Sequence, residues 1–162
     1  QAGVDDILFL LTGDGGEKPT LEHKIQSYQL ENVRLTGEIS KKQIPSLYAV
    51  SDLTITTFLN LPVLYTNSPN KFFDSLSAGK PVIVNSPGWT KEIVEKYQCG
   101  FYVDPERPEQ LAEQLMHIKT DKEKIDSMGA NALHVAREVF DREKMVGRIQ
   151  QVLSGILEKQ NS

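Results

Sequence analysis

The chain has 162 residues, 39% of them apolar and 25% charged, which suits one folded domain that can bury its own core. Eighteen Lys and Arg against 22 Asp and Glu give a formal charge of −4 and no basic block, which argues against a nucleic-acid-binding surface. No apolar run is long enough to span a bilayer, and the single cysteine, Cys99, excludes an intramolecular disulfide and lacks the spaced partners of a zinc site. We therefore expect a cytoplasmic protein.

The first elements in the chain are a strand, a helix and a second strand. The continuous apolar run ILFLLTG at 7–13 is typical of an interior parallel strand, covered on both faces, and it ends in the turn GDGG at 13–16. Apolar residues at helical spacing predict a helix over 19–30, with a proline in its first turn. The segment NVRLTG at 32–37 is the next predicted strand.

The middle of the chain repeats this alternation. We predict a helix over 40–52 and a strand rich in β-branched residues over 52–58. After a loop that contains Pro62, a short helix over 69–78 leads into the buried strand PVIVN at 81–85.

The last part of the chain turns from alternating elements to helices. A helix over 90–98 and the short strand GFYVD at 100–104 are followed by a helix over 107–119. Residues 121–159 have a helical pattern throughout, with a break at Phe140-Asp141, where Asp can cap a final helix.

The order of these elements predicts the fold class. Apolar strands that alternate with helices imply an α/β fold with a doubly wound parallel sheet, whose ligands bind beyond the carboxyl ends of the strands. The chain starts almost at once with a strand that looks central, and nothing precedes it that could form an outer strand and helix, so we expect a fragment of a longer protein.

The short helix over 69–78 has the features of an anion site. Ser68 is a good N-cap and Pro69 suits the first helical position, which would leave the amides of Asn70, Lys71 and Phe72 without intrahelical partners. Free amides and the positive end of the helix dipole attract phosphate without requiring a metal. Lys71 could reach the same phosphate.

One carboxylate lies on the exposed face of this helix. Asp74 is four residues after Asn70 and shares its face, so a nucleotide could place its diphosphate at the helix start and its ribose diol against Asp74. Spacing alone leaves a second interpretation open, in which Asp74 is a solvated helix residue and the Ser-Pro pair is only a capping device.

The segment NKFFDSLSAGKPVIVN resembles the nucleotide-binding segment of retaining GT-B glycosyltransferases of the family 4, or group 1, type. Their pattern is E-x-F-G-x-x-x-x-E-A-x-A-x-G-x-P-V. Aligned on AGKPV, Asp74 takes the place of the second Glu, which holds the ribose diol in that family. The first Glu, which contacts the donor sugar, becomes Thr66, and the Phe-Gly pair becomes Ser68-Pro69.

The resemblance implies roles for further residues. The phosphate-contacting amides of the family fall on Asn70 and Lys71, the base contact falls near Ile39, and the stretch Thr66 to Ser68, including Asn67, would face the sugar. The Ser-Pro-Asn-Lys and Asp variant is similar to a bacterial subgroup that assembles surface polysaccharides.

The resemblance also implies an overall function. The chain is similar to most of the Rossmann-like C-terminal domain of a GT-B enzyme that transfers a sugar from a UDP- or GDP-sugar, with retention and without a metal cofactor. The resemblance implies that residues 1–140 form the donor-nucleotide-binding domain, with its first strand and helix missing, and that residues 141–162 form a C-terminal crossover helix. The acceptor would be a glycan or a lipid-linked molecule at the inner face of the membrane. The family's acceptor site and catalytic His lie in an N-terminal domain absent here, so no catalytic residue is assigned and the chain alone should be inactive.

Two other functions stay open at this stage. A GT-B-like sugar-nucleotide epimerase shares the fold and ligand but needs acid–base residues that the sequence does not supply. A flavodoxin-like binding module without chemistry would show no dependence on Asp74. The apolar loop at 59–65 could line the site, meet the missing domain or touch a lipid-linked acceptor.

Overall fold

The computed structural model describes residues 6–160, with only the backbone described for 157–160. It contains the five strands that the sequence predicted, each somewhat shorter at its ends. They are β1 (Phe9–Thr12), β2 (Val33–Gly37), β3 (Thr54–Thr56), β4 (Val82–Val84) and β5 (Gly100–Tyr102).

The predicted helices are also present, in the predicted order. They are α1 (Lys18–Ser27), α2 (Ile44–Val50), α3 (Asn70–Ser77), α4 (Trp89–Tyr97), α5 (Glu109–Ile118), α6 (Lys122–Glu138) and α7 (Arg142–Gln160). The loop around Pro62 contains one short 3-10 turn, η1 (Pro62–Leu64).

The strands are parallel, which confirms the α/β class, but their pairing divides them into two groups. β1 pairs with β2, and β4 lies between β3 and β5. Among the described residues, β1 and β3 each have a strand partner on one edge only, because no segment of 6–160 lies hydrogen-bonded between them.

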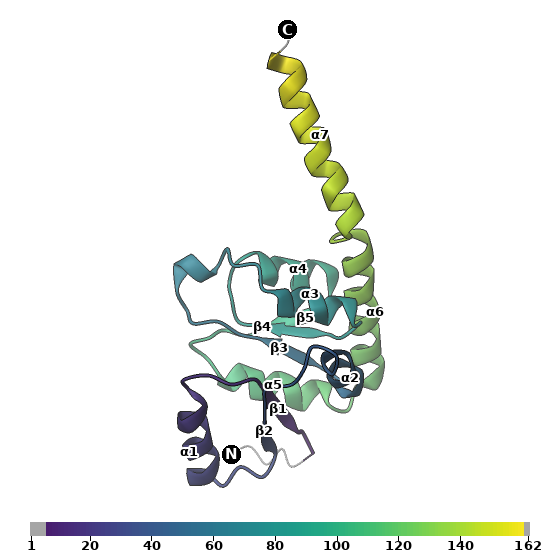
Figure 1. Ribbon diagram of the computed structural model, residues 1–162. Helices are drawn as coiled ribbons and strands as arrows, with labels where there is room; N and C mark the ends of the chain where they lie inside the picture. Colours follow the sequence, from purple (N-terminus) through teal and green to yellow (C-terminus); the bar gives the residue numbers. More distant parts are fainter. Residues whose placement is uncertain (1–5, 161–162) are drawn as a thin grey trace.

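Strand β4 divides the core into two clusters because successive side chains of a strand point to opposite faces. Val82 and Val84 pack on one face with buried residues of α3, α4 and α6. Ile83 packs on the other face with Val103 and Leu115 of α5. Figure 1 shows the same arrangement, with α3 and α4 on one side of the β3–β5 sheet and α5 on the other.

The final helix leaves the body of the molecule. Helix α7 projects away beyond the end of α6 (Figure 1), and the Asp141 Oδ1 atom accepts the Lys144 amide at 2.9 Å at its start. The predicted break at Phe140-Asp141 and the Asp cap are therefore confirmed.

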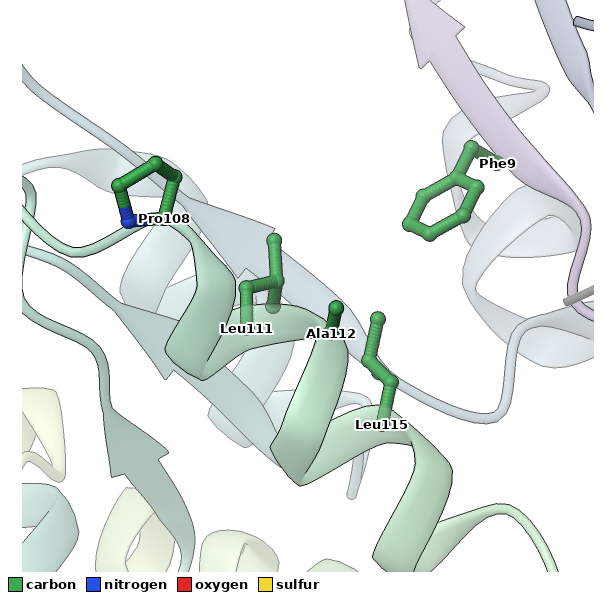
Figure 2. A pocket seen from close by; sticks show the side chains of 5 residues that line it. All are labelled: Phe9, Pro108, Leu111, Ala112 and Leu115. Carbon is green, nitrogen blue, oxygen red and sulfur yellow. The ribbon is translucent and has the colours of Figure 1, made fainter. Parts of the chain in front are cut away.

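An apolar hollow separates β1 from helix α5. Figure 2 shows Phe9 facing this helix. The hollow between them has a volume of about 140 Å³. The hollow is lined by Phe9, Pro108, Leu111, Ala112 and Leu115.

Candidate functional site

Helix α3 begins at Asn70, one residue later than the sequence predicted. Pro69 occupies the N-cap position with extended backbone angles, φ −78° and ψ 127°, and there is no side-chain cap. The prediction that Ser68 caps the helix and Pro69 opens it is therefore wrong. The Pro69 carbonyl accepts the Phe72 amide at 3.0 Å, so the first turn closes without the Ser68 hydroxyl.

The start of α3 still presents two backbone donors. Within residues 6–160, no hydrogen bond is found for the amides of Asn70 and Lys71, whereas the predicted third free amide, that of Phe72, is paired. Both donors lie at the positive end of an eight-residue helix, which is the arrangement that attracts an anion.

The two faces of α3 divide as the sequence predicted. Phe72 and Leu76 are fully buried, while Asn70 and Asp74 are exposed one helical turn apart. Gly79 then ends the helix with a φ of +66°, a left-handed conformation that favours glycine. The helix start and the Asp74 carboxylate are thus available on one solvent-facing surface.

The structure adds a neighbour of Asp74 that sequence reasoning missed. Burial raises the pKa of the Tyr48 phenol, a hydrogen bond with Ser75 opposes this rise, and the charge of Asp74 adds to it. The Lys80 Nζ atom donates to the Ala49 carbonyl at 3.3 Å. Helix α2, which follows the predicted base-contacting loop, therefore lies beside α3. No short-range pattern in the sequence signals this contact.

The segment before α3 is held against the start of α4. The Trp89 Nε1–H donates to the Asn67 carbonyl at 2.9 Å. A Cβ atom at Gly88 would lie 2.0 Å from the Tyr65 carbonyl oxygen, so only glycine allows this close approach. Thr66 is exposed, and its hydroxyl donates only a long bond of 3.5 Å to the Val63 carbonyl.

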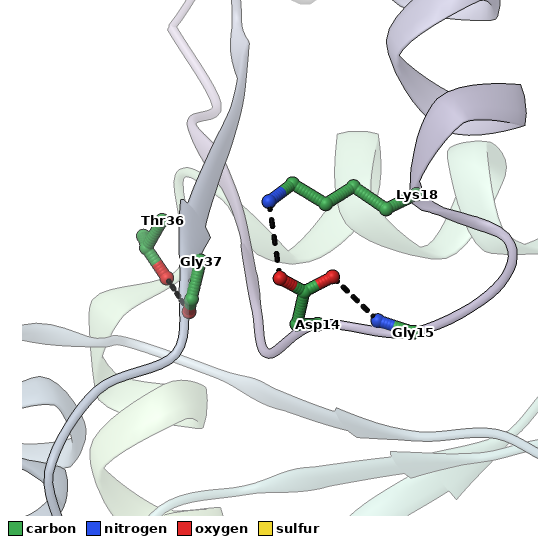
Figure 3. A network of polar contacts seen from close by, with 5 residues as sticks. All are labelled: Asp14, Gly15, Lys18, Thr36 and Gly37. Atoms are coloured by element: carbon green, nitrogen blue, oxygen red, sulfur yellow. Dashed lines mark hydrogen bonds and ion pairs between the residues drawn. The ribbon is translucent and has the colours of Figure 1, made fainter.

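The carboxyl ends of β1 and β2 meet in a polar cluster, drawn in Figure 3. The Gly13 amide donates to the Gly37 carbonyl at 2.9 Å, and both glycines have positive φ. Hydrogen bonds from the Gly15 amide and from Lys18 hold the pKa of Asp14 below its usual value. The loop that contains Ile39 leaves from this cluster, and the Ile39 side chain is half-buried.

The predicted site residues therefore fall into two places. Thr66, Asn67, Ser68, Asn70, Lys71 and Asp74 lie together along one segment, whereas Ile39 lies in the loop between β2 and α2. No hydrogen bond or ion pair among the described residues joins the two places.

Two hollows of the described structure lie away from this segment. The hollow beside Phe9, and another of about 340 Å³ among α4, β5, α5 and α6, are both lined by residues outside 66–74. In residues 6–160, no three His, Cys, Asp or Glu side chains are grouped to hold a metal ion. No helix in the described part of the chain has the length and apolar character needed to cross a membrane.

The chain is similar to a known family along most of its length. A family model described as "Glycosyl transferases group 1" matches residues 2–135. Alpha-D-kanosaminyltransferase of Streptomyces kanamyceticus is 26% identical over 128 residues, or 78% of this chain and 32% of the relative. Alpha-monoglucosyldiacylglycerol synthase of Acholeplasma laidlawii is 23% identical over 154 residues, or 94% of this chain and 37% of the relative. The chain thus spans about a third of the length of these curated relatives.

Solved structures have the same fold. A crystal structure of HepE from Anabaena in complex with UDP is 26% identical, with a TM-score of 0.74 over 92% of this chain and 41% of that chain. The HepE complex with UDP-glucose is 27% identical, with a TM-score of 0.75 over 91% of this chain and 41% of that chain. Sucrose-phosphate synthase of Thermosynechococcus elongatus, at 20% identity, has a TM-score of 0.77 over 93% of this chain and 38% of its own, which supports the fold alone.

Proposed function

Because this chain belongs to the group 1 glycosyl transferases, we propose that it is the nucleotide-sugar-binding half of a retaining, metal-independent glycosyltransferase. The observation that carries this proposal is the exposed start of α3, where two unpaired amides lie one turn from the Asp74 carboxylate. Membership of the family favours glycosyl transfer over the epimerase and over a binding module without chemistry.

Each part of the segment matches one part of a nucleoside diphosphate sugar. The Asn70 and Lys71 amides would bind the diphosphate together with the helix dipole, and the Lys71 ammonium would add charge. The Asp74 carboxylate would accept two hydrogen bonds from the ribose diol. Catalysis would then rest on positioning the donor and on stabilising the departing diphosphate, with the reacting groups of the acceptor side supplied by another domain.

The base that we propose is uracil. HepE, at 26–27% identity, was crystallised with UDP and with UDP-glucose, and this supports UDP over GDP for the present chain. The base would lie at the loop of Ile39, beside the cluster at the carboxyl ends of β1 and β2. This is where ligands of open parallel sheets bind.

We propose that residues 1–140 need a further strand to complete the donor domain. Leu8 and Leu10 are 58% and 38% exposed, although they belong to an apolar run typical of a strand covered on both faces. The open edges of β1 and β3 and the hollow beside Phe9 support a strand between them, supplied by another part of the protein. Helix α7, within 141–162, would cross to the acceptor domain.

The exposed apolar side chains of the loop before α3 support the proposal that this loop contacts a lipid-linked acceptor or a membrane surface. Leu59, Leu61 and Val63 are 74%, 47% and 77% exposed. The loop is nevertheless firmly held, because Asn85 exchanges two hydrogen bonds of 2.8 Å with the Phe58 backbone and Asn60 donates to Glu106. A fixed apolar surface beside the donor segment suits a lipid-linked acceptor in polysaccharide synthesis, at the cytoplasmic face of a membrane.

The test is an NMR titration of the 162-residue chain with UDP, GDP and ADP, each with and without Mg²⁺. We expect UDP to shift signals of residues 37–40 and 66–74 selectively and independently of Mg²⁺. Asp74→Ala should abolish these shifts. Glu113→Ala, which removes an exposed carboxylate from α5 instead, is the matched control and should keep them.

Two results would contradict the proposal. If no nucleotide moves signals of the folded chain, the segment has no donor site of its own. Equal loss of binding in both variants would show that overall charge, and not the Asp74 carboxylate, determines binding. We expect no turnover by the isolated chain with UDP-glucose and a glycan acceptor.

A further inference from the structure

Trp89 makes a specific polar contact with the proposed donor segment. The chain has one tryptophan, and its Nε1–H donates to the Asn67 carbonyl at 2.9 Å, across 22 positions in the sequence. Asn67 belongs to the stretch proposed to face the sugar. The Asn67 amide also donates within the loop, to the Leu64 carbonyl at 3.1 Å, so the indole N–H supplies a contact that joins this stretch to another helix.

The indole ring is fixed by three aromatic neighbours. It stacks on Phe73 of α3, with centroids 5.8 Å apart and an interplanar angle of 25°, and it meets Phe72 edge-on at 5.3 Å. Phe140, at the corner between α6 and α7, meets it edge-on at 6.0 Å. Such contacts favour defined ring geometries, so they restrict the direction in which the N–H points.

The backbone beside Trp89 supports the same segment. Gly88 lies directly against the Tyr65 carbonyl, so residues 65 and 67 are both held by the start of α4. In contrast, the Thr66 side chain between them is exposed and held only by a long hydrogen bond. The start of α4 thus contacts the segment that leads into the helix amides at two points, while the Tyr65 and Asn67 amides donate within the loop to the Pro62 and Leu64 carbonyls.

We propose that Trp89 is a positioning residue for donor recognition, which sets the place of Asn67 and with it the sugar-facing stretch Thr66 to Ser68. The inference rests on the proposed function, and it deepens that function by assigning discrimination between UDP-sugar and UDP to an indole N–H. Loss of this donor loosens the sugar-facing stretch while the Asn70 and Lys71 amides stay in helix α3. Affinity for UDP-glucose then falls more than affinity for UDP.

The test compares Kd values for UDP and UDP-glucose, measured by calorimetry, in the 162-residue chain and two variants. Trp89→Phe keeps an aromatic ring but removes the N–H donor, and it should weaken UDP-glucose about threefold to tenfold, the range of one neutral hydrogen bond, with a smaller effect on UDP. Tyr97→Phe is the matched control, because it removes a polar group from another aromatic residue of α4 and keeps the indole donor and its three ring contacts. It should leave the ratio of the two Kd values unchanged.

A second measurement covers the case in which Trp89→Phe does not fold. The single indole N–H gives one NMR signal in the unmodified chain, which we expect to exchange slowly with solvent and to shift with UDP-glucose more than with UDP. Equal weakening of both ligands in Trp89→Phe, or an indole proton that exchanges as fast as free indole, would overturn the inference. An unmodified chain that binds neither ligand would instead contradict the proposed function.

Discussion

The body of this protein has two halves, residues 6–53 and residues 54–140. Both consist of strands and helices, but they differ in how many side chains they bury. The buried apolar side chains lie between Phe72 and Val135, whereas no side chain of residues 6–53 is buried. Ile7, Phe9 and Leu53 of the first half pack at the edge of the cluster around Ile83. Figure 1 shows β1, β2 and α1 gathered at one end of the molecule, away from α3 and α4.

The difference shows that a segment can form regular strands and helices without forming a complete hydrophobic core. Strand β1 has the apolar sequence of an interior strand, yet it lies at the edge of a two-stranded sheet. Two strands seldom form a stable unit without a covered face. The second half, with three strands and helices on both faces, carries its own core and the proposed phosphate and ribose contacts.

The largest expected effect on stability comes from a substitution that leaves a cavity in the core of the second half. Phe72→Ala removes a fully buried ring and should lower the free energy of unfolding by about 3–5 kcal/mol. Leu8→Ala, at a side chain that is 58% exposed, should change it by no more than about 0.5 kcal/mol. Urea unfolding followed by circular dichroism measures both, and similar losses would refute the contrast between the halves.

A second pair of variants tests how closely the backbone is packed. A Cβ atom at Gly100 would lie 1.9 Å from the Val82 carbonyl oxygen, so Gly100→Ala should destabilise by about 3 kcal/mol. Nothing lies within 4 Å of a Cβ atom at Gly15, and Gly15→Ala should be nearly neutral. Thermal unfolding of the two variants checks this, and a neutral Gly100→Ala would mean that β4 and β5 are less tightly joined than described.

A third prediction concerns pH and the burial of Cys99. Burial raises the pKa of this thiol to about 11 from an ordinary value of 9.0. Since the folded state favours the neutral thiol, its contribution is complete below pH 9 and is lost as the pH rises to about 11, on the order of 2 kcal/mol. Cys99→Ala should therefore lose less stability than the unmodified chain over this interval in urea unfolding. Parallel pH curves would contradict a buried thiol.

The smallest expected effect comes from removing the ion pair that joins the two halves. The Lys119 Nζ atom lies 2.9 Å from Asp6, on the surface, and this contact holds the pKa of Asp6 below its usual value. Lys119→Ala should accelerate amide exchange in β1 by no more than about fivefold, as expected for an exposed pair. Exchange in β4 should not change, and a global acceleration would show that the two halves depend on this contact.

Much of this architecture could be predicted from the sequence because its signals are local. Apolar runs predicted all five strands, and Gly79 and Asp141 marked the end of one helix and the start of another. The start of α3 was misplaced by one residue because Pro69 tolerates an extended ψ as well as a helical one. The local signal therefore gave the helix but not its first residue.

Other features could not be predicted because they depend on tertiary contacts. The division of the strands into two groups depends on which edges meet. The electrostatic effect of Asp74 on Tyr48 and the hydrogen bond from Trp89 to Asn67 depend on helices brought together from separate parts of the chain. The roles of Ile39 and of the residues from Thr66 to Asp74 in binding a donor remain predictions.

Amide hydrogen exchange of the 162-residue chain, measured with and without UDP, tests the central claim most directly. The account predicts slow exchange in β3–β5 and faster exchange in β1 and β2 before UDP is added. UDP should then protect residues 66–74, most strongly at the start of α3, and also residues 37–40. Protection confined to other segments, or no change at any UDP concentration in a folded chain, would contradict a donor-nucleotide site at α3.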